Sequence, residues 1–544
     1  MAGMSGAGPE PKRLIAGMMI WLGVLAILPL MGGAFIVEKH EGDTLHLADL
    51  VLRMAEQGQM PHSDFMTPLG ILSIWPIVLM VKAGMGLGTA FLAAQTLLAV
   101  LLFAPVVYVA STRFRATLGW VYAAYTLALC LALVHGEGNA ALSMSMHYNR
   151  WAWALAYLVI PLAMLEPKNG RQPVLDGVIL GVALAVLGLV KATYVAAFLP
   201  VVVVALMARR DWVALGVGLL SGLAVVGAVT AVLGVGFWLA YLGDLLAVAS
   251  SETRAAPGLP LVGILVAPDH ILGTFVLIMT VILLRQSGRM VEGLVLLVLV
   301  PGFIYVTYQN YGNDPQWLVL LALLALDLRP DNASTNVFGW RLNSALLVSG
   351  ALAFALAAAS AINVVWSPLR MYLADSAELR PMLASRPAHS DLLVTPARVA
   401  RVVIREAGEE RFPVYAGKYV DDAQEPQFLN GEALPECEMS TGHNTWFETT
   451  ASALTEAGYA GSGVLIADLS TALWLYGDFK PIKGAAPWYY GGTPGLEAAD
   501  HVLVPLCPAN MAQRRVMLAA IEKAGWKLEE EMRTGTFVLL RPSK

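Results

Sequence analysis

The densest group of side chains able to do chemistry follows the first apolar segment. Glu38, Glu41 and Asp43 stand within six residues, with His40 between them. A carboxylate held at a partly dehydrated boundary can act as a general base toward a hydroxyl or ligate a divalent cation, because both tasks need an ionised oxygen. The same residues could instead be ordinary charged flanks of a membrane span, and the sequence leaves both interpretations open.

A second candidate site follows in the stretch GQMPHSDFMTPLG at 58–70. His62 and Asp64 are the residues in it that we expect to contact a substrate. Asp64 could alternatively serve as a turn or capping residue, since aspartate is frequent in turns.

Cationic and aromatic side chains stand at the start of two later apolar runs. The candidate substrate-binding residues there are His147, Tyr148, Asn149, Arg150, Lys191 and Tyr194. Arg150 is the strongest of them, because a guanidinium can bind a phosphate bidentately and an arginine at membrane depth is costly unless it is paired. Lys191 is the second candidate for this role. Both side chains could instead extend to lipid headgroups, and His147 could be a packing residue.

A third polar group separates two apolar runs in the sequence YQNYGNDPQW at 308–317. Its candidate substrate-binding residues are Tyr308, Asn310, Tyr311, Asn313, Asp314 and Gln316. Amides and aromatic faces suit a sugar, because each hydroxyl needs a donor or acceptor and the apolar ring face needs a flat surface. A tight turn would also favour Gly, Asn, Asp and Pro, although it explains the Tyr and Gln residues less well.

Composition indicates a membrane scaffold for these residues. Of the 544 residues, 57% are hydrophobic and 14% charged, whereas soluble proteins carry about 25% charged residues. This composition excludes a purely soluble enzyme. Apolar runs predict a polytopic α-helical protein with eleven membrane spans, at 14–37, 88–111, 116–135, 151–165, 174–190, 192–208, 212–235, 271–284, 291–307, 316–328 and 342–365.

The distribution of basic residues predicts the orientation of these spans, because Lys and Arg accumulate on the cytoplasmic side. With the N-terminus inside, the inner side collects twelve of them and the outer side six. The run at 69–85 would invert this bias if it spanned the membrane, so we interpret it as a re-entrant or interfacial helix. The outer face then receives the C-terminal region and four loops, at 38–68, 136–150, 236–270 and 308–316, of which we interpret 236–270 as a plain connection.

The chain divides at about residue 367. Residues 1–367 carry 36 charged side chains and residues 368–544 carry 39, about 10% against 22%. Strand-like runs at 464–467, 502–505 and 537–540 and a helical run at 509–524 predict an extracytoplasmic α/β domain at 368–544. Cys437 and Cys507 lie in it and could form a disulfide or remain two buried thiols. No basic stripe occurs anywhere, which excludes a nucleic-acid partner.

The first outer loop carries a longer pattern. An acidic cluster opens it, an amphipathic segment follows at 44–56, and 58–70 reads Gly-x-x-Pro-x-x-Asp-Phe-x-x-Pro-x-Gly. Together with the long first span and the C-terminal domain, this loop resembles the start of the GT-C superfamily of polytopic membrane glycosyltransferases. The resemblance implies that the acid just after the first span is the general base. It maps onto Asp43, with Glu41 as neighbour or substitute, and Gly42 between them leaves that choice open.

The resemblance also implies substrates and location. The expected reaction is an inverting transfer from a polyprenyl-phosphate sugar to a hydroxyl of a glycan, lipid or protein acceptor, at the outer face of the inner membrane. No cofactor is certain; Mg²⁺ or Mn²⁺ remains open because members of the superfamily differ. The alternative function is a transporter or lipid flippase of cell-envelope precursors, which would place charges near the bilayer midplane rather than at one face. A third possibility is a non-catalytic assembly factor whose membrane part serves only as an anchor, but eleven spans are more than an anchor needs.

Overall fold

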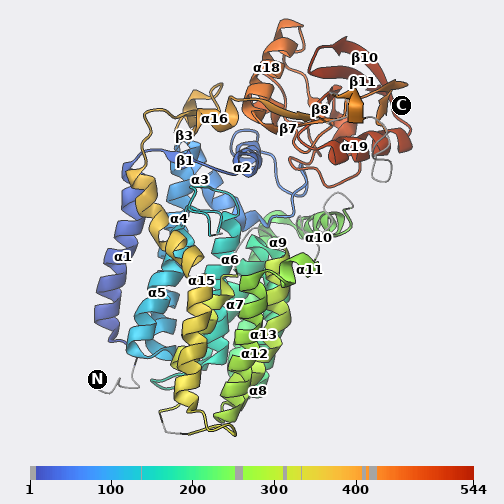
Figure 1. The fold of residues 1–544 in the computed structure, drawn as a ribbon. Coiled ribbons are helices and arrows are strands. Elements are labelled where there is room, and N and C mark those ends of the chain that lie inside the picture. The colour runs from blue at the N-terminus through green and yellow to red at the C-terminus, as the bar shows by residue number, and fades with distance from the viewer. Residues whose placement is uncertain are drawn as a thin grey trace.

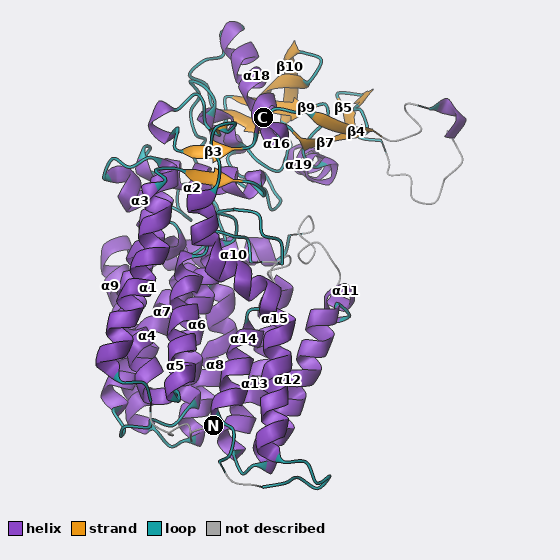
Figure 2. Cartoon of the chain, turned by 60° about the vertical axis from the view of Figure 1, so that its left-hand side comes forward, coloured by secondary structure: helices purple, strands orange, loops and turns teal. Residues whose placement is uncertain are grey.

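A bundle of long helices carries a smaller α/β region at one end, while the N-terminus lies at the opposite end (Figure 1). The computed structural model describes residues 8–136, 138–251, 261–309, 315–331, 334–406, 412–415 and 426–544. Figure 2 shows that the strands gather at the end of the α/β region and that the bundle itself is helical.

Every apolar run expected to span the membrane coincides with a helix. The bundle consists of α1 (Pro11–Met31), α4 (Leu87–Arg113), α5 (Ala116–Leu131), α6 (His147–Met164), α7 (Pro173–Val190), α8 (Ala192–Ala208), α9 (Trp212–Leu233), α12 (Pro268–Gln286), α13 (Met290–Gln309), α14 (Trp317–Asp327) and α15 (Leu342–Leu373). Among the described residues, seven helices are long and apolar enough to cross a membrane, namely α1, α4, α7, α9, α12, α13 and α15. These helices indicate a multi-pass membrane protein; a count of eleven spans stays a prediction.

The first apolar helix ends earlier than expected. α1 stops at Met31, and residues Phe35–Val37 form strand β1, which pairs in parallel with β3 (Leu392–Val394). The expectation of a continuous span to residue 37 is wrong at its end, because the apolar residues there pair with a distant strand. β3 also pairs with β2 (Arg380–Pro381), so this small sheet joins the first outer segment to the C-terminal region.

Asp391 fixes this junction onto the bundle. Its carboxylate accepts hydrogen bonds from the backbone N–H groups of Gly88 (3.1 Å) and Thr89 (2.7 Å) in the first turn of α4. Its carbonyl accepts the N–H of Phe35 at 2.8 Å. A Cβ at Gly88 would come within 2.4 Å of that carbonyl oxygen, so this close approach requires glycine.

The segment at 69–85 forms no helix long enough to cross a bilayer. It forms a short 3₁₀ turn, η1 (Ile71–Ser73), followed by α3 (Trp75–Lys82). α3 has eight residues and is therefore about 12 Å long, compared with about 30 Å for a bilayer core. A non-spanning helix here agrees with the expected orientation.

The segment expected to be a plain connection at 236–270 contains a helix. α10 (Val235–Ala249) carries Tyr241 and Asp244, and α11 (Leu261–Leu265) precedes α12. Gly234, with a φ of 78°, separates α9 from α10. The prediction of a loop is wrong for its first part, because the apolar residues that follow Gly234 form a second helix instead of a connection. α10 lies at the end of the bundle that faces the C-terminal region (Figure 1).

The C-terminal region contains the expected mixture of strands and helices. A four-stranded sheet has the order β10-β11-β9-β8, and β8 and β9 run parallel to each other. Its elements are β8 (Val464–Ile466), β9 (His501–Pro505), β10 (Lys527–Arg533), β11 (Phe537–Ser543) and α19 (Met511–Lys523). The edge strand β10 was not anticipated, because its sequence KLEEEMR is strongly charged, a composition typical of exposed edges. α15 continues past residue 367 to Leu373 before this region begins.

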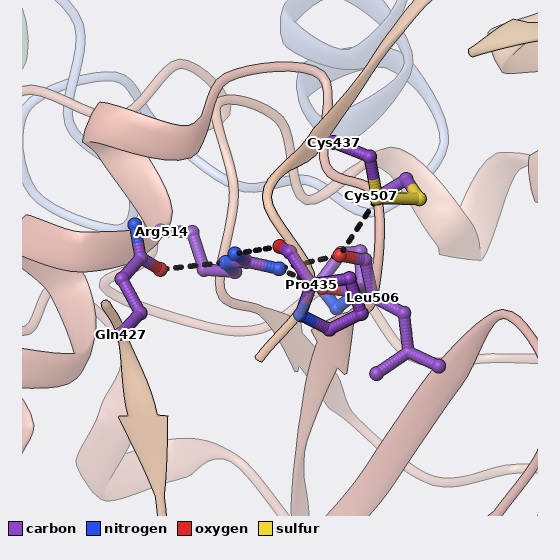
Figure 3. Close-up of a disulfide and its surroundings, with 7 residues drawn as sticks. Gln427, Pro435, Cys437, Leu506, Cys507 and Arg514 are labelled. Atoms are coloured by element: carbon purple, nitrogen blue, oxygen red, sulfur yellow. Dashed lines mark hydrogen bonds between the residues drawn. A yellow bond between two sulfur atoms is a disulfide. The ribbon is translucent and has the colours of Figure 1, made fainter. Parts of the chain in front are cut away.

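Smaller elements complete the region. They are η2 (Pro387–His389), α16 (Pro396–Val399), β4 (Val403–Glu406), η3 (Pro413–Tyr415), β5 (Phe428–Leu429), β6 (Glu432–Ala433), β7 (Cys437–Thr441), α18 (His443–Glu456), η4 (Ala472–Leu475) and η5 (Leu496–Ala498). Cys437 and Cys507 form a disulfide (Figure 3). Beside it, Arg514 donates hydrogen bonds to the carbonyl oxygens of Pro435 and Leu506.

Helix α2 (Glu41–Ala55) fixes the C-terminal region to the bundle. Its fully buried Asp49 and Arg53 form an ion pair at 2.6 Å. Trp474 Nε1 donates to Asp49 Oδ1 at 2.9 Å, and Arg53 Nη1 donates to the carbonyl oxygen of Ile482 at 2.9 Å. The C-terminal half of α2 is therefore held against the C-terminal region.

Candidate active site

Asp43 lies in the first turn of α2, where the positive end of the helix dipole favours an acid. Its side chain is half-buried, and Asp43 Oδ2 accepts a hydrogen bond from Ser145 Oγ at 2.6 Å. Ser145 belongs to the segment that connects α5 with α6. Two of the expected outer loops therefore meet at this carboxylate.

The same serine binds Arg150 from its other side. Arg150 Nη1 donates to the carbonyl oxygens of Ser145 (3.1 Å) and His135 (3.0 Å). Ser145 thus contacts an acid through its hydroxyl and a guanidinium through its carbonyl. The structure brings the two predicted residues Asp43 and Arg150 together through one intervening residue.

Arg150 is buried without a counter-ion. Its side chain stands in the first turn of α6, and the residue is 1% exposed. Nε and Nη2 have no hydrogen-bond partner, and no described carboxylate lies within ion-pair distance of the guanidinium. Because an uncompensated buried charge is unfavourable, two unused donors here suit an anion.

Lys191 joins this group from the junction between α7 and α8. Its Nζ donates to Asn149 Oδ1 at 2.7 Å and lies 4.8 Å from the centre of the Tyr148 ring. Tyr194, one turn further along, is fully buried, and its hydroxyl has no hydrogen-bond partner among the described residues. Five predicted residues, Tyr148, Asn149, Arg150, Lys191 and Tyr194, therefore share one neighbourhood.

His135 is a site residue that the sequence did not single out. Its Nδ1 lies 2.9 Å from Ser145 Oγ, and its ring stacks on that of His40 at 4.2 Å between centres. Burial, together with the nearby His40 and Arg150, lowers the pKa of His135 to about 3. The imidazole is therefore neutral near pH 7. Neither His135 nor Ser145 carries a motif, so only the folded contact with Asp43 identifies them.

Glu41 has a different environment from Asp43. Both of its carboxylate oxygens accept hydrogen bonds from Arg398, at 2.9 and 3.1 Å. Glu41 is buried and faces the C-terminal region, so it joins two parts of the molecule.

His62 and Asp64 point away from Arg150, each toward its own partner. Asp64 accepts the N–H of Met60 at 2.9 Å and pairs with Lys483 at 3.1 Å, which is the turn role left open by the sequence. His62 Nδ1 lies 2.8 Å from Asp244 Oδ2, and its ring packs on Tyr241 of α10. These contacts attach the 58–70 stretch to the C-terminal region and to α10.

His147 and Gln316 are buried framework residues. His147 Nε2 lies 2.8 Å from the carbonyl oxygen of Ser73, and aromatic rings surround the imidazole. Gln316 Oε1 accepts the Tyr125 hydroxyl at 2.6 Å, and its Nε2 donates to the carbonyl oxygen of Gly136 at 3.2 Å. Tyr308 is half-buried at the end of α13. The remaining predicted residues, Asn310, Tyr311, Asn313 and Asp314, lie outside the described residues.

The acids considered as ligands for Mg²⁺ or Mn²⁺ diverge. Glu38 accepts the N–H of Leu142 at 2.7 Å, Glu41 binds Arg398 and Asp64 binds Lys483. Within the described parts of the chain, no group of three or more His, Cys, Asp or Glu side chains is arranged to hold a metal ion. These residues therefore do not fit a shared cation site.

Fold and site define a multi-pass membrane protein whose polar residues converge at the end of the bundle that carries an α/β region. No family model, curated protein or solved structure matches this chain.

Proposed function

We propose that this chain is a membrane glycosyltransferase that moves a sugar from a polyprenyl-phosphate donor to an acceptor hydroxyl. The observation that carries the proposal is the shared contact of Asp43 and Arg150 with Ser145. A transfer of this kind needs a base next to the acceptor and cationic donors next to the departing phosphate. Asp43 and the unused donors of Arg150 are groups of those two kinds.

In the proposed step, Asp43 accepts the proton of the acceptor hydroxyl. The acceptor oxygen forms a bond to the anomeric carbon while the bond from that carbon to the phosphate oxygen breaks, and its electron pair leaves on polyprenyl phosphate. One such displacement inverts the anomeric configuration. Arg150 and Lys191 stabilise the phosphate as its charge develops.

Asp43 rather than Glu41 is the base in this proposal. Both oxygens of Glu41 accept hydrogen bonds from Arg398 of the C-terminal region, whereas Asp43 Oδ2 accepts the hydroxyl of Ser145, whose carbonyl oxygen binds Arg150. Glu41 is therefore assigned a positioning role for the first turn of α2.

We place the site on the extracytoplasmic face of the inner membrane. The Cys437–Cys507 disulfide supports this side for the C-terminal region, because disulfides persist in oxidising compartments. The excess of basic residues in the opposite loops supports it independently. The unpaired Arg150 stands at the start of its helix rather than in the middle, which favours an enzyme over a transporter or flippase.

A transfer assay tests the proposal. Purified full-length protein in nanodiscs is given undecaprenyl-phosphate-linked hexoses and pentoses with glycan, lipid and peptide acceptors. We expect transfer in at least one combination, and a loss of about 100-fold or more in Asp43→Asn. Asp375→Asn, at an exposed acid outside the site, is the matched control and should retain activity. Full activity in Asp43→Asn would overturn the assignment.

A further inference from the structure

A cleft outside the Asp43–Arg150 site opens between α2 and the C-terminal region. Its volume is about 390 Å³, within the range of small-molecule sites. Gly42 and Leu45 of α2 form one wall, and α18, β7, the segment after β8 and the segment after β9 form the others. Gly42 and Leu45 flank Asp43 in the sequence, so the cleft adjoins the turn that carries this acid.

Aromatic residues line the cleft. Trp446 and Phe447 lie side by side in α18, with ring centres 5.1 Å apart, and both are buried, with Phe447 stacked on Tyr476. Trp488 enters from the C-terminal region, is partly exposed, and lies 5.4 Å from the ring of His46 on α2. Aromatic faces of this kind pack against the apolar faces of sugar rings, as they do against other flat ligands.

Polar groups accompany these rings. Ser470 Oγ is buried and has no hydrogen-bond partner among the described residues, although the residue lines the cleft. His443 is largely buried, which lowers its pKa, and its neutral ring hydrogen-bonds the backbone of Met439, which leaves its other ring nitrogen for a ligand. An unused hydroxyl and a neutral imidazole beside aromatic rings match the hydroxyl groups of a saccharide.

The charges of the cleft disfavour an anionic ligand. Glu438 and Asp468 contribute two carboxylates, against the single guanidinium of Arg405. Asp468 also shapes the wall, because it accepts the backbone N–H groups of Ala509 and Asn510 at 2.6 and 3.0 Å. An uncharged ligand avoids repulsion from this acidic excess.

We infer that this cleft binds an uncharged saccharide. Its role as the sugar acceptor rests on the proposed transferase function. A saccharide held against Gly42 and Leu45 lies beside the first turn of α2, the turn that also carries Asp43. The donor lipid approaches from the bilayer and Arg150.

Saccharide binding by the full-length protein in detergent tests the inference. The probe is an array of mono- to tetrasaccharides that includes neutral hexoses, pentoses and N-acetylhexosamines, with hexuronates as the anionic comparison. We expect binding of neutral members and weaker binding of hexuronates. Trp488→Ala should weaken binding at least about tenfold, whereas Trp526→Ala, in the same region but outside the cleft, should not change it. The absence of binding, or binding unaffected by Trp488→Ala, would overturn the inference.

Gly42 offers a second variant that leaves the fold intact. A Cβ at Gly42 would meet nothing within 4 Å, and replacing a helical glycine favours the helix. Gly42→Leu should fill this wall and reduce saccharide binding at least about tenfold, while Gly42→Ala should bind as the native chain does. Equal binding by both variants would contradict the position of the ligand.

The experiments distinguish a failure of the saccharide-binding inference from a failure of the proposed transferase function. Asp43→Asn should bind the same saccharides as the native chain while losing transfer. If saccharides bind but no lipid-linked sugar is transferred, the proposed reaction fails and the cleft remains a saccharide site. If transfer occurs without saccharide binding in this cleft, the inference fails and the proposed reaction stands.

Discussion

The two ends of the helix bundle differ in how their buried charged side chains are paired. At the end away from the C-terminal region, Arg113 pairs with Asp176 at 2.6 Å, Lys168 with Asp327 at 3.1 Å, and Arg209 with Glu292 at 3.2 Å. At the other end, Arg150 is equally buried and pairs with no described carboxylate. Paired charges join helices to one another. A buried cation that the described chain leaves unpaired points instead to a ligand.

Arginine replacement at each end is the strongest test of this comparison. Arg113→Met leaves Asp176 buried without its partner and should destabilise the protein by about 3 to 5 kcal/mol. Arg150→Met removes a cation that has no counter-ion, so its stability should change little while binding of undecaprenyl phosphate falls. Thermal unfolding and lipid binding in nanodiscs measure the two effects. A large loss of stability in Arg150→Met, with unchanged lipid binding, would make Arg150 a framework residue.

Asp468 extends the comparison to a buried acid held by backbone N–H groups. Burial raises its pKa from 3.8 to about 6, although backbone hydrogen bonds oppose the shift. The unfolded chain therefore loses this proton at a lower pH than the folded protein. Stability should fall as pH rises from about 4 to above 6, by up to about 3 kcal/mol. Melting temperatures across this interval should show a shallower slope in Asp468→Asn, and parallel slopes would contradict the shift.

Two lysines, one at each end of the bundle, offer a smaller test. Lys191 donates to Asn149 in the Arg150 group, whereas Lys168 pairs with Asp327 at the opposite end. Lys191→Met should weaken binding of undecaprenyl phosphate about tenfold, since one cation of the group is lost. Lys168→Met should leave lipid binding unchanged and lower the melting temperature. Identical behaviour of the two variants would remove the distinction between the ends.

The smallest expected effect concerns Glu41. Glu41→Gln keeps the size of the side chain but weakens its pairing with Arg398, which is more than one third exposed. We expect a loss of stability below about 1 kcal/mol and a modest decrease in transfer. Transfer rates check the role: Asp43→Asn should lose about 100-fold or more of the activity, and Glu41→Gln should keep most of it. A loss in Glu41→Gln as large as that in Asp43→Asn would exchange the two assignments.

The helices of the bundle could be predicted from local composition, but their pairings could not. Each expected apolar run is a helix, because length and hydropathy are properties of contiguous residues. β1 was taken as the end of a span, since its partner β3 lies far along the chain. The helix α10 was missed because Gly234 and its apolar neighbours resemble a connection as much as a helix start.

For the candidate site, too, individual residues could be predicted from the sequence but their contacts could not. Residue type singles out the acidic cluster and Arg150, and the family resemblance selects Asp43 within that cluster. Ser145 and His135, which connect them, carry no distinctive pattern. Gln316 was expected to contact a sugar, yet its amide lies among Tyr125, Ser360 and Gly136 inside the bundle. The chemistry that a side chain could perform was predictable from its residue type, whereas the residues that lie next to it are known only from the fold.

The joining of β1 to β3 has a consequence for biosynthesis. Glu41 and Arg398, which lie beside this junction, are 357 positions apart in the sequence. The first outer segment is therefore synthesised long before the residues of the C-terminal region that bind it. Closing so distant a contact is slow compared with forming local helices. The first turn of α2 therefore lacks its Arg398 contact until translation has passed residue 398, which is after the early helices of the bundle have been made.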